Sequence, residues 1–189
     1  PKTPKPRASN KLNMGSFVSN PEAKIVIVGL DNAGKSTLIL RMKPDNFDEK
    51  VDDIAATVGF QQESFQKNEI NFTAFDMSGQ GKYRDMWQRY YESAEAIIFV
   101  VDASDQLRIR VAKNELDLLL EDEILLKNDV PILFFANKMD LGEAMTTLEV
   151  SEALELDNIT DRTWNIQGCS AKTGKGIEEG MKWISDIVE

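Results

Sequence analysis

The residues whose chemistry is easiest to recognise are Gly29–Ser36, a run that contains two glycines, a lysine and a serine. They follow the apolar segment 25–28 and lead into residues 37–42, whose pattern is typical of a helix. This order fits the phosphate-binding P-loop, in which backbone N–H groups surround an anion at the positive end of the new helix. Lys35 would contact the β- and γ-phosphates of a nucleotide, and the Ser36 hydroxyl would bind Mg²⁺. The alternative is a glycine-containing turn without a ligand, which the two flanking elements disfavour.

Two later segments carry groups that suit the far end of a bound phosphate chain. Asp76 ends an expected strand and can hold the metal through water, while Gly79 lets its backbone N–H approach the γ-phosphate and Gln80 can orient an attacking water. Thr57 ends a long connection, and its hydroxyl can reach Mg²⁺ and the γ-phosphate. Taken alone, Thr57 is an ordinary loop residue and Asp76 a solvated turn residue. The predicted catalytic residues are Lys35 and Gln80, and the predicted metal ligands are Ser36, Thr57 and, through water, Asp76.

Two further segments predict the choice of base. In Asn137–Asp140, the Asp140 carboxylate can accept hydrogen bonds from N1–H and the 2-amino group of guanine, a donor pair that adenine lacks. Asn137 can tie this loop to the P-loop, and the stem of Lys138 can cover the base. In Cys169–Lys172, the Ala171 N–H can donate to guanine O6. The predicted nucleotide-binding residues are Asp31, Asn32, Ala33, Gly34, Lys35, Ser36, Thr37, Thr57, Gly79, Asn137, Lys138, Asp140, Ser170, Ala171 and Lys172.

The rest of the chain supplies alternating strands and helices that position these segments. Apolar or alternating runs predict six strands, at residues 25–28, 59–66, 70–76, 96–101, 132–136 and 163–169. Helical spacing predicts helices at 37–42, 107–120, 148–156 and 176–188. The separation of the second and third strands by Lys67-Asn68-Glu69 fits a hairpin. We therefore expect an α/β fold, a single P-loop NTPase domain with a mostly parallel six-stranded sheet, one antiparallel hairpin strand and helices on both faces.

The composition limits the binding partners and the cellular compartment that we expect. The net charge is −10, and residues 1–20 hold four basic side chains and no acidic one, so the acidic remainder argues against nucleic-acid binding. The single cysteine, Cys169, excludes an internal disulfide and suits a reducing cytoplasm, and we expect it to pack in the core. No apolar run approaches the length of a membrane span. We interpret residues 1–20 as a disordered, vector-derived leader and residues 21–189 as the folded domain.

Five motifs in this order resemble those of the small GTPases of the Ras superfamily, over roughly residues 24–188. The runs GLDNAGK at 29–35 and TVGF at 57–60 resemble the Arf and Arf-like branch. FDMSGQGKYR at 75–84 and PILFFANKMDL at 131–141 are most similar to the Arf-like subgroup associated with the Bardet–Biedl coat complex. The run at 75–84 departs from most Arf proteins, which have tryptophan and glycine where Phe75 and Ser78 stand. Ala56 also replaces a usual proline.

The resemblance implies a switch that binds GTP or GDP with Mg²⁺, hydrolyses GTP slowly and, in its GTP form, recruits a BBSome-like coat complex. It implies a cytoplasmic protein that associates reversibly with ciliary or plasma membrane, and further partners in an exchange factor and a GTPase-activating protein. Arf proteins reach the membrane through an N-terminal helix, which we interpret as missing from this sequence. The implied effector residues are Phe60, Phe75 and Tyr90, with core packing as the alternative for Phe75.

Two other functions stay open at this point. One is a nucleotide-dependent binding module in which hydrolysis has no role. The other is a P-loop kinase, although the sequence offers no lid-like arginine cluster and a kinase would leave Asn137–Asp140 unexplained.

Overall fold

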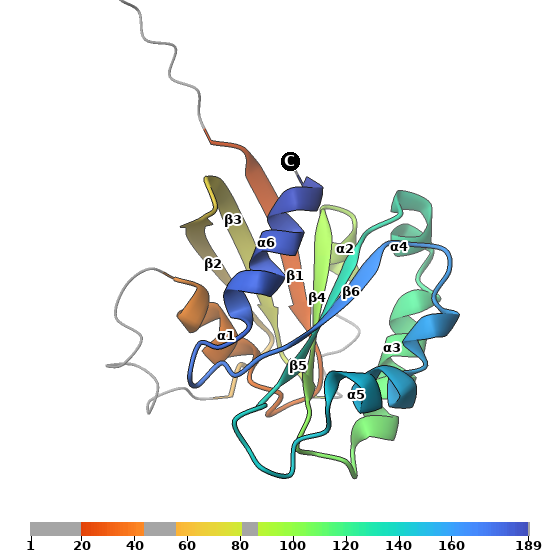
Figure 1. Ribbon diagram of the computed structural model, residues 1–189. Coiled ribbons are helices and arrows are strands. Elements are labelled where there is room, and N and C mark those ends of the chain that lie inside the picture. The colour runs from red at the N-terminus through yellow and green to blue at the C-terminus, as the bar shows by residue number, and fades with distance from the viewer. Residues whose placement is uncertain (1–19, 44–55, 81–86, 189) are drawn as a thin grey trace, which may run out of the picture.

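The computed structural model describes residues 20–43, 56–80 and 87–188 of the chain, and the expected leader falls almost wholly outside them. Its centre is a six-stranded sheet in the order β2-β3-β1-β4-β5-β6, in which only β2 and β3 pair antiparallel (Figure 1). The strands are β1 (Glu22–Val28), β2 (Phe60–Lys67), β3 (Ile70–Met77), β4 (Ala96–Asp102), β5 (Ile132–Asn137) and β6 (Trp164–Gly168). The predicted fold class is confirmed.

Helices cover both faces of the sheet and enclose two apolar cores. α1 (Lys35–Met42) and α6 (Ile177–Val188) bury their apolar sides on one face. The opposite core receives side chains from α2 (Gln88–Tyr91), α3 (Ile109–Leu120), α4 (Glu123–Asn128) and α5 (Thr147–Leu154). Strands β4 and β5 are buried along almost their whole length, as their continuous apolar sequences predict. No helix among the described residues is long and apolar enough to cross a membrane.

The β2–β3 hairpin closes in a tighter turn than the sequence predicts. Lys67 pairs with Ile70, so only Asn68 and Glu69 form the turn, and their φ angles are 49° and 64°. Two successive positive φ angles are the requirement of a type I′ turn, whose twist matches that of the strands. Asparagine adopts this region readily and glutamate does not, which explains why the pattern did not indicate a two-residue turn.

Three helical features differ from the predictions. α2 and α4 were not expected, because segments of four and six residues are too short to show a helical period. The Asp122 carboxylate begins α4 by accepting hydrogen bonds from the N–H groups of Ile124 and Leu125. The helix expected at 148–156 ends at Leu154, because Glu155 adopts φ 55° and turns the chain into the 3₁₀ turn Leu156–Asn158.

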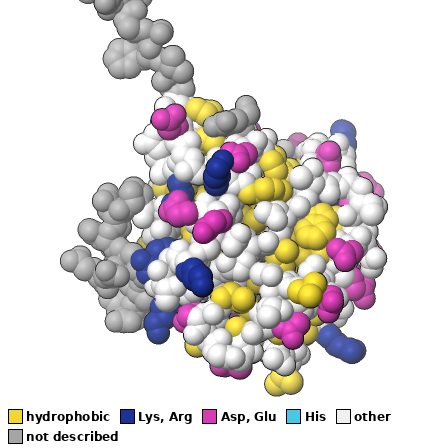
Figure 2. Space-filling model, in the orientation of Figure 1, with side chains coloured by type: hydrophobic (Ala, Val, Ile, Leu, Met, Phe, Trp, Pro, Cys, Tyr) yellow, Lys and Arg dark blue, Asp and Glu magenta, His cyan; other side chains and the backbone are white. Residues whose placement is uncertain are grey.

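The sheet has two edges, β2 and β6. All five residues of β6 are half-buried, and Figure 2 shows apolar side chains gathered on the face between α6 and α4, where this strand lies. The predicted site segments instead lie at one end of the sheet. Because β1, β3, β4, β5 and β6 run parallel, the loops that follow them meet at their shared carboxyl edge.

Candidate nucleotide site

The P-loop joins β1 to α1 and depends on its two glycines. Gly29 has φ 137°, and a Cβ there would lie 2.2 Å from the Val100 carbonyl oxygen. Gly34 has φ 91°, and a Cβ there would lie 2.4 Å from the side-chain nitrogen of Asn137. The Lys35 side chain is buried, and its Nζ donates to the carbonyls of Gly29 at 3.1 Å and Leu30 at 2.9 Å. The loop thus holds an ammonium group at the start of α1, where an anion is favoured.

The predicted metal-binding oxygens come together from three segments of the chain. The Ser36 hydroxyl donates to Asp76 Oδ2 at 2.5 Å, and the Thr57 hydroxyl donates to the same atom at 3.1 Å. The two hydroxyl oxygens are 2.9 Å apart. Asp76 is 1% exposed, and its second carboxylate oxygen has no hydrogen-bond partner among the described residues.

This oxygen set suits Mg²⁺. Burial raises the pKa of Asp76, although the Ser36 hydrogen bond, the Lys35 charge and the Thr57 hydrogen bond oppose that shift. A divalent cation would supply the compensation that the buried, half-satisfied carboxylate needs. Two hydroxyls with a single carboxylate match the way magnesium binds beside substrate phosphates, since it keeps several waters and needs few protein charges.

Gly79 and Gln80 lie against the P-loop. A Cβ on Gly79 would come within 2.2 Å of the Asp31 nitrogen, so only glycine fits this approach of two backbones. The Gln80 N–H donates to the Ser78 hydroxyl at 3.4 Å, and the Ser78 carbonyl accepts the indole N–H of Trp87 at 3.2 Å. A pocket of about 370 Å³ follows from this packing. It is lined by Asp31, Asn32, Gly34, Lys35, Ser36, Thr37, Ala56, Thr57, Ser78, Gly79 and Gln80.

A second pocket, of about 270 Å³, contains the predicted base-reading residues. It is lined by Gly34, Thr37, Asn137, Lys138, Asp140, Leu141, Ala171 and Lys172. Gly34 and Thr37 line both pockets, so the two pockets adjoin at the P-loop and the start of α1. This arrangement suits a nucleotide whose phosphates lie in the first pocket and whose base lies in the second.

Asn137 fastens three loops together. It ends β5 and is 1% exposed. Its amide nitrogen donates to the Ala33 carbonyl at 2.8 Å, and its amide oxygen accepts the Ala171 N–H at 2.9 Å. The sequence predicts that this N–H donates to guanine O6, whereas in the structure it donates to Asn137, which thereby orients the loop. Asp140 Oδ1 accepts the Ser170 hydroxyl at 2.6 Å, which leaves its other oxygen for the base edge.

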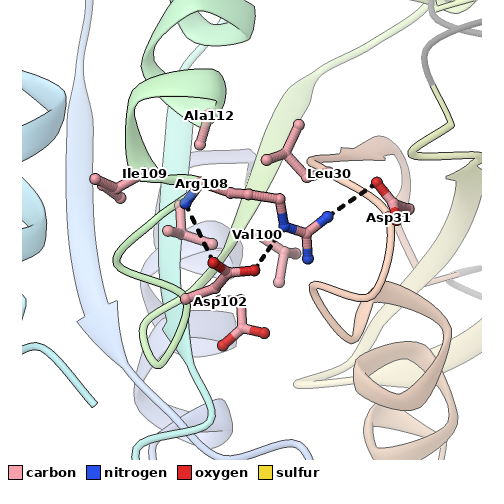
Figure 3. Close-up of a pocket in the computed structure, with 9 residues that line it drawn as sticks. Leu30, Asp31, Val100, Asp102, Arg108, Ile109 and Ala112 are labelled. Carbon is pink, nitrogen blue, oxygen red and sulfur yellow. Dashed lines mark hydrogen bonds and ion pairs between the residues drawn. The ribbon is translucent and has the colours of Figure 1, made fainter. Parts of the chain in front are cut away.

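Several side-chain contacts that support the site show no sequence signal. Lys138 has φ 67°, and its Nζ lies 2.6 Å from Asp102 at the end of β4. Figure 3 shows Arg108, at the start of α3, reaching Asp31 of the P-loop, with 3.2 Å between Nη1 and Oδ1. The same guanidinium bonds Asp105 at 2.6 Å and lowers the pKa of that carboxyl. Asp31 and Arg108 are 77 positions apart, so no local pattern could have paired them.

The predicted effector aromatics form a row beside the site. Tyr90 lies between the other two, with ring centroids 4.9 Å from Phe60 and 4.9 Å from Phe75. Phe60 is 40% exposed, whereas Phe75 is only 9% exposed. Phe75 therefore packs in the core, as the alternative interpretation proposed, and Phe60 and Tyr90 form the accessible part of the row.

Cys169 is also buried, as expected, and burial raises the pKa of its thiol.

Comparison with known proteins gives consistent matches. A sequence profile described as the ADP-ribosylation factor family matches residues 10–188. ADP-ribosylation factor-like protein 6 of Danio rerio is 47% identical over 88% of this chain and 89% of its own length. ADP-ribosylation factor J of Dictyostelium discoideum is 40% identical over 90% of this chain and 87% of its own length. The structure of the Arl6 BBS3 small GTPase from Trypanosoma brucei, with the bound nucleotide analogue GppNp, has a TM-score of 0.81 and 39% identity. The match covers 88% of this chain and 97% of the Trypanosoma brucei chain.

Proposed function

Because this chain belongs to the ADP-ribosylation factor family of small GTPases, we propose that it is an Arf-like switch whose GTP form recruits a BBSome-like coat complex for trafficking of ciliary membrane proteins. GTP hydrolysis itself follows from the family. Support for the coat function comes from the likeness to two proteins named for Arf-like protein 6, one of which also carries the name BBS3. The proposal includes an exchange factor, a GTPase-activating protein and reversible association with ciliary or plasma membrane.

One observation carries the nucleotide part of the proposal. The phosphate pocket and the base pocket meet at Gly34 and Thr37, and Asp140 lies in the second. Protein purified without added nucleotide should therefore release GDP or GTP when it is denatured, because a bound nucleotide of this class persists through purification. Chromatography of the released nucleotide checks this. Recovery of an adenine nucleotide would contradict the guanine assignment.

The proposed magnesium site consists of Ser36, Thr57 and, through water, Asp76. When bound there, Mg²⁺ would neutralise charge on the β- and γ-phosphate oxygens. Lys35 places a second positive charge beside the same oxygens. We assign the Gly79 N–H to the γ-phosphate, because the Gly79 backbone packs closely against the P-loop. The Gln80 amide holds the attacking water in line with the bond that breaks, so the protein contributes positioning and charge and forms no covalent intermediate.

The described lining of the phosphate pocket includes no arginine. Among the described residues, the charge that develops on the transferred phosphoryl group is therefore compensated only in part. An activating protein that inserts an arginine would raise the rate by about 10³–10⁵. This is the physical reason for including such a partner in the proposal.

Tyr90→Ala should reduce coat binding while leaving nucleotide affinity unchanged. The ring contacts Phe60 and Phe75 and does not line either nucleotide pocket. Loss of an aromatic anchor at an interface costs about 2 kcal/mol, which is roughly a thirtyfold loss of affinity. Pull-down of the coat complex by GTP-loaded protein measures this, and Leu148→Ala, an exposed position on α5, is the control. Equal coat recovery with Tyr90→Ala and wild type would place the effector surface elsewhere.

A further inference from the structure

We infer that Arg41 is a positioning residue for the loop that reads the guanine base, an inference that rests on the proposed guanine-nucleotide function. Arg41 lies in the last turn of α1. Its Nε donates to the Ala171 carbonyl at 3.2 Å, and its Nη2 donates to the Lys172 carbonyl. One guanidinium thus holds two successive carbonyls of a segment that is 130 positions away in sequence.

These carbonyls belong to the wall of the base pocket. Ala171 and Lys172 line that pocket, and the loop is fixed from its other side by Asn137, which accepts the Ala171 N–H at 2.9 Å. Ser170 adds a third attachment through its 2.6 Å hydrogen bond to Asp140. Arg41 therefore holds the side of the loop that Asn137 and Asp140 do not reach. Without it, the Ala171 backbone would be fixed at its N–H and not at its carbonyl.

Arginine suits this position for two physical reasons. Its planar fork can donate to two acceptors at a fixed spacing, whereas the lysine ammonium is a single point charge. A cation in the last turn of a helix also faces the negative end of the helix dipole. The stem of Arg41 passes Gly174, whose φ is 85° and whose missing Cβ would lie 3.4 Å from Arg41 Cδ. Glycine there satisfies both the backbone angle and the close passage of the side chain.

The arrangement gives α1 a role at both ends. Its first residue, Lys35, carries the ammonium at the phosphate pocket, and Arg41 lies about 9 Å farther along the helix axis. The helix has only 8 residues and is anchored in the core by Leu38, Ile39 and Met42. One rigid element therefore sets the distance between the phosphate-binding loop and the wall of the base pocket.

The test is the release rate of GDP that carries a fluorescent N-methylanthraniloyl group on its ribose, because that label leaves the base unmodified. Arg41→Met removes both hydrogen bonds and keeps an unbranched stem, and should accelerate release about tenfold. Arg41→Lys can serve one carbonyl at a time and should accelerate release about two- to threefold. Arg110→Met is the matched control, since Arg110 is exposed on α3, and its release rate should equal that of wild type.

A second readout separates loop positioning from general loosening of the site. The same measurements are made with labelled IDP, whose base keeps O6 and N1–H and lacks the 2-amino group assigned to Asp140. Because Arg41 holds the Ala171–Lys172 side, both nucleotides should be released faster by the same factor. The ratio of their rates should therefore stay at the wild-type value.

Three results would overturn the inference. One is release from Arg41→Met within about twofold of wild type. Another is an IDP-to-GDP ratio of release rates that falls toward one, since the effect would then extend to Asp140. If Arg41→Met does not stay folded, Arg41→Lys decides, and an unchanged rate in that variant would count against the inference. Wild-type protein that bound neither nucleotide would instead overturn the proposed function, and this is seen before any variant is compared.

Discussion

Gln80→Leu is expected to stop GTP hydrolysis while GTP affinity and the fold stay unchanged. Gln80 lines the phosphate pocket, and its assigned task is to hold the attacking water in line with the γ-phosphate. Leucine has a similar size and no hydrogen-bonding group, so the water loses its orientation while the phosphate contacts remain. Misplacement of a reacting group costs about 10²-fold in rate or more. The measurement is single-turnover hydrolysis with and without an activating protein.

Gln66→Leu provides a matched control for this experiment. It makes the same chemical change at an exposed position of β2, close to the hairpin turn. The control should hydrolyse GTP at the wild-type rate. If Gln80→Leu hydrolysed GTP as fast as wild type in the presence of activator, Gln80 would not be the water-positioning residue. If neither wild type nor Gln80→Leu hydrolysed GTP under any condition, a binding module without useful turnover would be the better description.

The sequence predicts most of the fold and the location of the site because both depend on local patterns. Continuous apolar runs indicate buried parallel strands, and parallel strands bring their following loops to one edge of the sheet. That topology alone places Ser36, Asp76 and Asn137 near one another, although they are far apart in the chain. The structure brings Ser36, Thr57 and Asp76 within hydrogen-bond distance of one another.

What the sequence could not predict depends on long-range contacts between single side chains. The hydrogen bonds from Arg41 to Ala171 and from Arg108 to Asp31 join residues with no shared periodicity or motif. The burial of Phe75 has the same origin. An aromatic residue in an alternating strand can face a core or a partner, and only the packing of Tyr90 against it decides. Propensity likewise gave no indication that Glu69 and Glu155 would adopt positive φ.

Asp140→Asn is expected to weaken GDP binding by about 10³-fold or more and to shift the preference from guanine to xanthine nucleotides. Asp140 lines the base pocket, and one of its carboxylate oxygens already accepts the Ser170 hydroxyl at 2.6 Å. The other oxygen is therefore the acceptor for N1–H and the 2-amino group of guanine. Asparagine can keep the Ser170 contact through its carbonyl oxygen. It then turns an NH₂ group toward the two guanine donors, which leaves buried donors facing each other without an acceptor.

Xanthine reverses this penalty because it has an oxygen where guanine has its 2-amino group. The asparagine NH₂ can donate to that oxygen, so the Asp140→Asn variant should bind xanthosine diphosphate more tightly than GDP. The measurement is displacement of labelled GDP by unlabelled GDP, by xanthosine nucleotides and by adenosine nucleotides, which gives both preferences. Asp157→Asn, at an exposed position of the 3₁₀ turn, makes the same change outside the pocket and should bind like wild type. Equal binding of ATP and GTP by wild type would remove Asp140 as the base filter. A variant that bound GDP as tightly as wild type would do the same, because the assignment requires the carboxylate charge and acceptor to face the guanine edge.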